Sequence, residues 1–239
     1  MKTTKHFIIT LLALSFGMIS CEDEIFLEGN KDVQTEIRRA SGFEEIASSG
    51  DFIVNVHSGE TYSVEVRAES NLLSYIETDV VGNTLKIRTR GVHNLVQNYP
   101  IEVTITTPTL KGLSLSGSGR INTDSFMSDQ FKIALSGSGD VDTEVSADIV
   151  RANVTGSGTI FLAGDAKTSE FVISGSGKIK SYPFEQDNCE AVISGSGDMF
   201  VNANETIDAR ISGSGRVFYI NYPVIHTSIS GSGRVVNDN

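Results

Sequence analysis

Apolar and polar residues alternate along most of the C-terminal half of the chain. Over residues 113–121, leucine, glycine or isoleucine occupies the odd positions, and serine or arginine occupies the even ones. A period of two is typical of a β-strand with one buried face. The pattern returns in seven units, each built around the word Ser-Gly-Ser-Gly or its variant Thr-Gly-Ser-Gly. The words begin at Ser116, Ser136, Thr155, Ser174, Ser194, Ser212 and Ser230.

The words recur at a nearly fixed distance. Successive starts are 20, 19, 19, 20, 18 and 18 residues apart, a period that predicts a solenoid of stacked supersecondary units. Turn residues punctuate the spacers, and none of the spacers is long enough for a crossover helix. We therefore expect an all-β fold, a right-handed parallel β-helix with coils of about 19 residues, each holding two or three short strands. A less regular β-rich part precedes it.

The inward positions predict the core of the solenoid. An aliphatic residue precedes every word, as Leu115 does, and another apolar residue stands two positions after it, as Ile121 does. Both glycines of each word share this inward parity. Because glycine weakens a strand, a repeated pair implies that the backbone bends there or that the opposite wall comes close. We expect a corner of a narrow β-helix at each word.

The outward positions form two columns of candidate binding residues. The first residues of the seven words make up the Ser/Thr ladder. The charged column lies four residues later and consists of Arg120, Asp140, Thr159, Lys178, Asp198, Arg216 and Arg234. In it Asp198 would lie between Lys178 and Arg216, about 4.8 Å from each, and exposed pairs of this kind contribute roughly 0.2–1 kcal/mol. This favours a stacking role for the column, with a charged ligand stripe as the alternative.

Residues 41–112 are also β-rich but less regular. Residues 52–57 and 62–67 both alternate, and the intervening Ser58-Gly59-Glu60 predicts a hairpin. Further strands are expected at residues 85–89, after the turn Gly82-Asn83, and at residues 101–105. The segment Ser48-Ser49-Gly50-Asp51 resembles a degenerate copy of the repeat word, so the solenoid is expected to begin there. No cap is evident after the last word.

The N-terminus predicts export and a lipid anchor. Residues 1–20 combine basic Lys2 and Lys5 with an apolar stretch too short to span a bilayer, as in a secretory signal peptide. The following Cys21 completes a segment that resembles a bacterial lipoprotein box, which implies acylation of Cys21 and a membrane anchor. Residues 21–40 are expected to form a flexible tether. Its acidic start at residues 22–24 resembles the export signal of surface lipoproteins in the Bacteroidetes.

Charge and cysteine content exclude several partners and constraints. The net charge is −11, and loss of Lys2 and Lys5 with the signal peptide would bring it to −13 (−11 − 2). A strongly acidic chain is a poor partner for nucleic acid or an anionic lipid surface. Once Cys21 is acylated, Cys189 is the only other cysteine, so an internal disulfide is impossible.

Candidate chemistry is sparse. The four histidines do not stand at metal-ligand spacing, and no cofactor motif is present, so we expect neither a metal nor a cofactor. A serine nucleophile repeated in seven similar contexts is implausible. Parallel β-helices do host polysaccharide-degrading enzymes, which need carboxylates close together. Asp140 and Asp198 would be three coils apart, about 14 Å, so we expect no catalysis.

The Gly-Phe-Glu-Glu-Ile segment at residues 42–46, the alternating residues 52–66 and the Ser-Gly-Ser-Gly words together carry a resemblance. From about residue 41 to the C-terminus the chain resembles the auto-transporter adhesin family with the head GIN domain, common in the Bacteroidetes. The resemblance implies a single β-helical domain over residues 41–239, divided at residue 112, and a cell-envelope location. It brings no catalytic residues.

These features favour a surface-exposed, lipid-anchored adhesin that presents its outward ladders to a glycan or a protein. An alternative is a periplasm-facing envelope component that assembles with itself or a neighbour through the edge of the C-terminal coil. A polysaccharide-active enzyme is a third, weaker reading. The location is expected to be the outer membrane, and nucleic acid is not expected as a partner.

Overall fold

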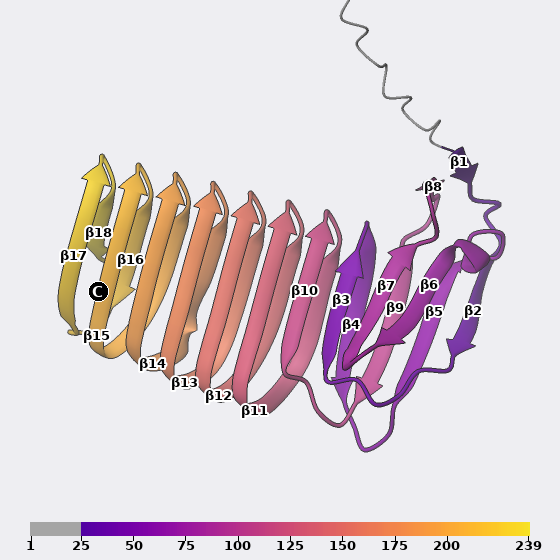
Figure 1. Cartoon of the computed structure of the whole chain (residues 1–239), viewed down its shortest axis with the longest axis horizontal. Helices are drawn as coiled ribbons and strands as arrows, with labels where there is room; N and C mark the ends of the chain where they lie inside the picture. The colour runs from indigo at the N-terminus through magenta and orange to yellow at the C-terminus, as the bar shows by residue number, and fades with distance from the viewer. Residues whose placement is uncertain (1–24) are drawn as a thin grey trace, which may run out of the picture.

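The structure, a computed structural model, describes residues 25–239. Its larger part is a β-solenoid whose coils stack side by side along one axis (Figure 1). Successive coils pair in parallel, which places equivalent residues of neighbouring repeats beside each other. The predicted all-β solenoid with coils of about 19 residues is confirmed. Its strands are β10 (Gly112–Gly117), β11 (Arg120–Gly137), β12 (Asp140–Gly156), β13 (Thr159–Gly175), β14 (Lys178–Gly195), β15 (Asp198–Gly213), β16 (Arg216–Ile220), β17 (Val224–Gly231) and β18 (Arg234–Asn237).

Each central coil is one long bent strand. β12, for example, runs for 17 residues while it remains paired with both neighbours. The register shifts between Phe161 and Gly164 of β13, and between Ser181 and Glu185 of β14, mark bulges at some of the bends. A bulge lets a strand bend without ending its pairing. The prediction of two or three short strands per coil is therefore wrong, because turn residues in the spacers bend the strand rather than break it.

The Ser-Gly-Ser-Gly words form the corner at which one strand ends and the next begins. Gly137 has a φ of 114°, a conformation that L side chains rarely adopt. A Cβ there would also lie 2.5 Å from the carbonyl oxygen of Gly117 in the preceding coil. That oxygen accepts hydrogen bonds from the N–H groups of Ser138 and Gly139, both at 3.0 Å. The expected corner is confirmed.

Apolar ladders fill the interior of the solenoid. The column that precedes the words is buried from Leu115 to Ile211, and the column that follows them is buried from Ile121 to Val217. Every member lies in register with its neighbours. Stacking of like side chains from coil to coil therefore removes apolar surface from water along the whole rod, which is the main source of its stability.

The solenoid begins before the regular repeats. β3 (Glu45–Ser49) pairs in parallel with β10, and β4 (Phe52–Ser58) pairs in parallel with β11. Between them Gly50 has a φ of 134°, and its N–H donates to the carbonyl oxygen of Ser116 at 2.9 Å. The predicted start of the solenoid at this segment is confirmed, with a shift of one residue, because Ser49 rather than Ser48 lies opposite Ser116.

The predicted hairpin between residues 52–57 and 62–67 is wrong. β4 and β5 (Ser63–Glu69) do not pair with each other, because β9 (Ile101–Thr107) lies between them. β9 pairs in parallel with β4 and antiparallel with β5. Its inward residues Ile101, Val103 and Ile105 are fully or almost fully buried, so inserting this strand adds a layer of core that a direct hairpin would not provide.

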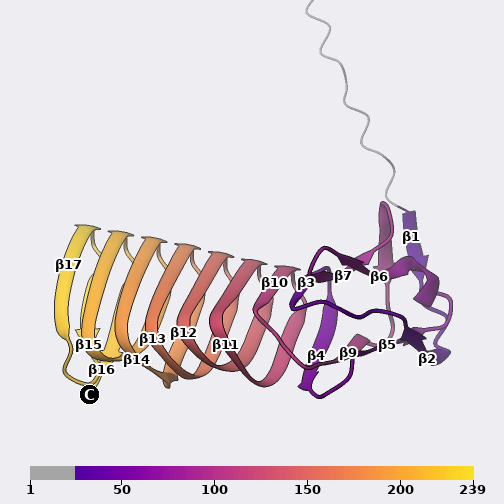
Figure 2. The same cartoon turned by 60° about the horizontal axis from the view of Figure 1, so that its bottom comes forward.

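The two walls of the solenoid continue into the N-terminal part as two sheets (Figure 2). One consists of β3, β7 (Thr84–Thr89) and β6 (Ile76–Val81), in which β6 and β7 form a hairpin around the predicted Gly82-Asn83 turn. The other consists of β4, β9, β5 and β2 (Val33–Arg38). The 3-10 helix η1 (Leu73–Tyr75) leads from the second sheet into the first.

Residues 25–38, expected within the flexible tether, form two strands instead. β2 pairs antiparallel with β5, and β1 (Ile25–Glu28) pairs in parallel with β8 (His93–Val96) in a small separate sheet. Alternation in β2 is weak because only one of its edges is paired and most of its side chains are exposed, so its sequence did not indicate a strand.

The signal peptide predicted at residues 1–20, Cys21 and the acidic residues 22–24 lie outside the residues that the structure describes. Between residues 25 and 239, no helix is long and apolar enough to cross a membrane.

Candidate functional site

The Ser/Thr ladder runs along the outer surface as predicted. Its seven residues lie in register from coil to coil, and all are exposed. Ser49 of β3 extends the ladder by one coil. The ladder is therefore a straight row of hydroxyl groups about 4.8 Å apart, on the side of the corner opposite to the charged column.

The charged column also lies in register on the outward side of the strands, although Asp198 is only 8% exposed, and ion pairs connect part of it. Arg120 donates to Asp140 at 2.8 Å, and Arg216 donates two hydrogen bonds to Asp198, both at 2.9 Å. The hydrogen bonds to Asp198 raise the pKa of Arg216 above its usual value. Both carboxylate oxygens of Asp198 accept hydrogen bonds from Arg216. Among the described residues Asp198 therefore makes no ion pair with Lys178, although the two lie in register. Arg234 lies beside Arg216.

A third outward column, which the sequence reasoning missed, lies two residues beyond the charged column. It brings together Asp142, Phe161, Lys180, Phe200 and Phe218 on successive coils. Each follows directly after a member of the inward column that starts at Ile121. Reading the repeat alignment one position further would have revealed aromatic residues where a solvent-facing strand ordinarily carries polar ones.

The central part of this column lines a cleft of about 640 Å³. We call it the aromatic cleft, and its lining residues are Asp142, Phe161, Leu162, Ala163, Lys180, Tyr182, Pro183 and Phe200. The bulge in β14 after Ser181 carries Tyr182 and Pro183, which form one wall. The cleft thus arises where the regular coil path is interrupted.

The aromatic rings in and beside the cleft are held by their neighbours. The Lys180 Nζ lies 4.9 Å from the centroid of the Phe161 ring. Phe200 and Phe218 stack with centroids 4.9 Å apart, and Tyr182 meets Phe200 edge to face at 5.6 Å. The Tyr182 hydroxyl donates to Asp238 at 2.7 Å, and burial together with this hydrogen bond raises the pKa of Tyr182 above its usual value. The rings therefore have little rotational freedom to lose on binding.

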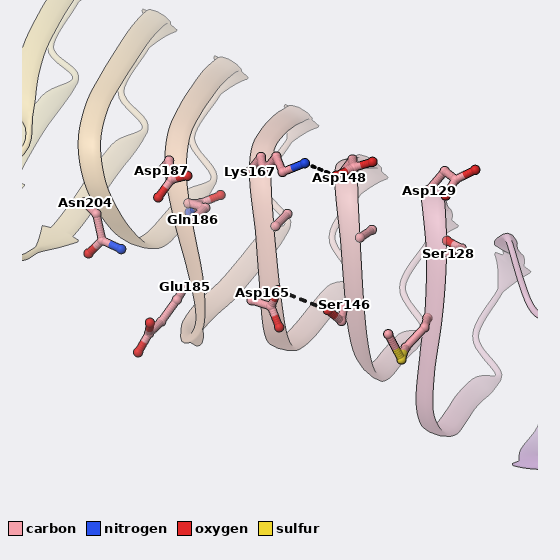
Figure 3. Close-up of a pocket in the computed structure, with 13 residues that line it drawn as sticks. Ser128, Asp129, Ser146, Asp148, Asp165, Lys167, Glu185, Gln186, Asp187 and Asn204 are labelled. Carbon is pink, nitrogen blue, oxygen red and sulfur yellow. Dashed lines mark hydrogen bonds and ion pairs between the residues drawn. The ribbon is translucent and has the colours of Figure 1, made fainter.

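An acidic groove of about 570 Å³ lies on another face, across β11 to β15 (Figure 3). Lys167 pairs with Asp148 at 2.5 Å, and the Ser146 hydroxyl donates to Asp165 at 3.0 Å. The pair with Asp148 raises the pKa of Lys167. Figure 3 shows the remaining carboxylates spread over successive coils, without a common centre. Among residues 25–239, no group of three or more His, Cys, Asp or Glu residues could hold a metal ion.

The arrangement offers little for catalysis. Asp140 and Asp198 lie three coils apart, as expected. Asp165 and Glu185 do occupy adjacent coils, but both are exposed, whereas a carboxyl that acts as a general acid is usually raised in pKa by burial. Burial raises the pKa of the Cys189 thiol to about 12, so the reactive thiolate is disfavoured.

The comparisons with known proteins agree with this geometry. Residues 42–223 match the family described as "Putative auto-transporter adhesin, head GIN domain". The chain belongs to this family. The resemblance seen in the Ser-Gly-Ser-Gly words is thereby confirmed, and membership suggests an adhesin-like, non-catalytic role in the cell envelope. No curated protein matches the chain in sequence.

Solved structures share the fold of this head GIN chain. A protein titled a putative adhesin from Bacteroides fragilis has a TM-score of 0.84 at 24% identity, covering 88% of this chain and 99% of its own. A putative lipid binding protein from Parabacteroides distasonis has a TM-score of 0.75 at 24% identity, covering 90% and 100%. A putative adhesin from Parabacteroides merdae has a TM-score of 0.73 at 21% identity, with the same coverage. At these identities the likeness concerns the fold alone.

Proposed function

We propose that the protein is a lipid-anchored adhesin without catalytic activity, exposed on the cell surface, that binds its ligand along the outer columns of the solenoid. The observation that carries this proposal is the unbroken register of exposed side chains over the successive coils. Outward side chains that recur at a fixed spacing along the axis suit repeated contacts with an extended ligand, whereas catalysis needs one distinct constellation. Family membership supports the same role.

The anchor and the surface location rest on Cys21 and on the acidic residues that follow it. Protease treatment of intact cells of the native host tests both. We expect the wild-type protein to be digested from unbroken cells, and the Cys21→Ala variant to be released from the membrane fraction. Protection of the wild-type protein until lysis would place it in the periplasm and contradict the surface location.

Adhesion itself is tested with purified protein and with cells that lack it. The protein is expected to bind a surface glycan or protein, and its deletion is expected to lower cell adhesion. Incubation with envelope and dietary glycans is expected to release no new reducing ends. Release of reducing ends would contradict the absence of catalysis, and a blank binding screen with unchanged adhesion would contradict the adhesin.

A second candidate is an envelope component that assembles through the last coil. Within the described residues, one edge of β17 pairs with β15 and its other edge pairs with no strand. Val224 and Ile229 of this strand are 60% and 42% exposed. Such an edge can accept another strand. Light scattering tests this candidate: an assembly that Val224→Lys returns to a monomer supports it, and a strict wild-type monomer contradicts self-assembly.

A further inference from the structure

The third outward column carries a phenylalanine on three of its coils. Phe161 is 37% exposed, and Phe200 and Phe218 are half-buried. The two rings nearest the cleft, Phe161 and Phe200, lie two coils apart, about 9.6 Å along the axis. This distance is close to the length of two linked sugars. The C–H face of a pyranose ring is apolar and packs against an aromatic ring, while its hydroxyls remain free for hydrogen bonds.

Two ammonium groups without a carboxylate partner lie on the coil between these rings: Lys180 lines the cleft, and Lys178 stands two residues earlier on the same strand, outside the lining. Lys180 contacts the Phe161 ring, and Lys178 lies beside Asp198, whose oxygens both accept from Arg216. Among residues 25–239, neither lysine forms an ion pair within 4.0 Å. On a chain with a net charge of −11, such a local excess of positive charge favours an anionic ligand. Asp142, at the other end of the cleft, can accept a hydrogen bond from a sugar hydroxyl.

The size of the cleft fits a short stretch of a polymer. Eight residues line its 640 Å³, whereas a stable interface with a folded protein buries about 800 Å² on each side and involves 20–30 residues. The bulge at Tyr182 and Pro183 forms one wall, and the column of outward residues continues along the axis to Phe218. A few sugar residues can therefore lie in the cleft while the chain continues beyond it.

We propose that the aromatic cleft binds an anionic glycan, a polysaccharide whose sugars carry carboxylates, with the glycan chain parallel to the solenoid axis. This inference rests on the proposed adhesin function and gives it a ligand class and a face. Phe161 and Phe200 stack on sugar rings two residues apart, and Lys178 and Lys180 pair with the sugar carboxylates. The Ser/Thr ladder lies around the corner and takes no part in the contact.

The test measures calorimetric binding of alginate and hyaluronan oligosaccharides to the purified protein. Carboxyl-reduced forms of the same oligosaccharides are the neutral controls. We expect binding of at least one carboxylated form, weakened at least tenfold by carboxyl reduction and weakened further by added salt. Phe161→Ala, Phe200→Ala and Lys180→Ala are each expected to weaken binding about tenfold, as expected when one anchoring contact is removed.

Matched variants separate loss of the site from loss of the fold. Met127→Ala removes another exposed apolar side chain, 81% exposed in the acidic groove, and Lys132→Ala removes an exposed lysine away from the cleft. Both are expected to bind like wild type. Phe161→Tyr keeps the ring and is expected to retain binding, and all variants should melt within a few degrees of the wild-type protein.

The outcomes distinguish this inference from the proposed function. Failure of every carboxylated oligosaccharide to bind, equal binding of the reduced forms, or full binding by the cleft variants would each overturn the inference. If deletion of the protein still lowers cell adhesion in those cases, the adhesin function stands with another ligand or face. If deletion of the protein does not change cell adhesion and no ligand is found, both the inference and the adhesin function are wrong.

Discussion

The two glycines of each repeat word are constrained in different ways. The first, such as Gly137, combines a positive φ with close contact to the backbone of the preceding coil. The second, such as Gly139, has no positive φ, but a Cβ there would collide with the carbonyl oxygen of Gly119. The sequence predicted a bend or a close approach. The structure contains both, because strand pairing brings adjacent corners within one strand spacing.

Substitution at the first glycine should be costly. Gly137→Val forces a β-branched residue into a positive φ and against the Gly117 carbonyl, so we expect a loss of at least about 2 kcal/mol in the free energy of unfolding. Urea unfolding measures it. Ser138→Ala, at the exposed corner position next to it, is expected to stay within about 0.5 kcal/mol of wild type. A Gly137→Val variant as stable as wild type would contradict the role of the corner.

Among the strands, the sequence predicted the elements that repeat, but it did not predict which strands pair when they lie far apart in the chain. The words gave the coil period, the inward ladders and both predicted outward columns. They could not place β9 between β4 and β5, since strands of similar alternation can pair in several orders. Nor could they reveal the aromatic cleft, because it needs a bulge that carries Tyr182 towards Phe200 from the neighbouring coil.

Glu69, at the end of β5, connects elements that the sequence did not associate. Its side chain is 1% exposed and accepts hydrogen bonds from the Lys31 N–H at 2.6 Å and from the Asn98 N–H at 2.8 Å. Burial alone would raise the pKa of Glu69, but these bonds, with the Asn98 side chain and the Tyr99 N–H, hold the pKa below its usual 4.5. One carboxylate therefore ties the segments next to β1 and β8 to β5.

The lowered pKa gives a pH dependence of known sign. The stabilisation from ionised Glu69 is fully present above pH 4.5, the ordinary value, and is lost as the pH falls through the lower folded-state pKa. We expect the hydrogen-exchange protection factors of residues 25–31 and 93–98 to fall as the pH drops through the folded-state pKa of Glu69, before those of the solenoid coils fall. Glu69→Gln should show fast exchange there at neutral pH and a weaker pH dependence. Slow exchange in Glu69→Gln would show that the carboxylate does not hold these segments.

At the scale of the whole molecule, the stack separates stability from specificity. The inward ladders run through all regular coils, whereas the aromatic column occupies only part of the rod, from β13 to β16. A solenoid coil interacts chiefly with its two neighbours, so a local bulge can create a cleft without disturbing distant coils. The scaffold is thus regular, and the candidate binding surface arises from the departures from regularity.

This organisation predicts that a whole coil can be removed. Deleting residues 156–174 removes 19 residues and joins Thr155 to Gly175, so that Thr155 takes the place of Ser174 in the repeat word. The deletion also places Asp140 beside Lys178, two side chains of opposite charge. We expect a folded rod shorter by about 4.8 Å, somewhat less stable, and without the Phe161 contact of the cleft. X-ray scattering and circular dichroism measure the length and the fold.

The matched control deletes about half a coil, residues 156–165, and joins Thr155 to Ala166. This places spacer residues where the corner glycines belong and misaligns the inward ladders with both neighbouring coils, so we expect aggregation or unfolding. If both deletions fold equally well, register between coils does not determine stability. If neither folds, the coils depend on contacts beyond their nearest neighbours, and the solenoid is one cooperative unit rather than a stack of separable ones.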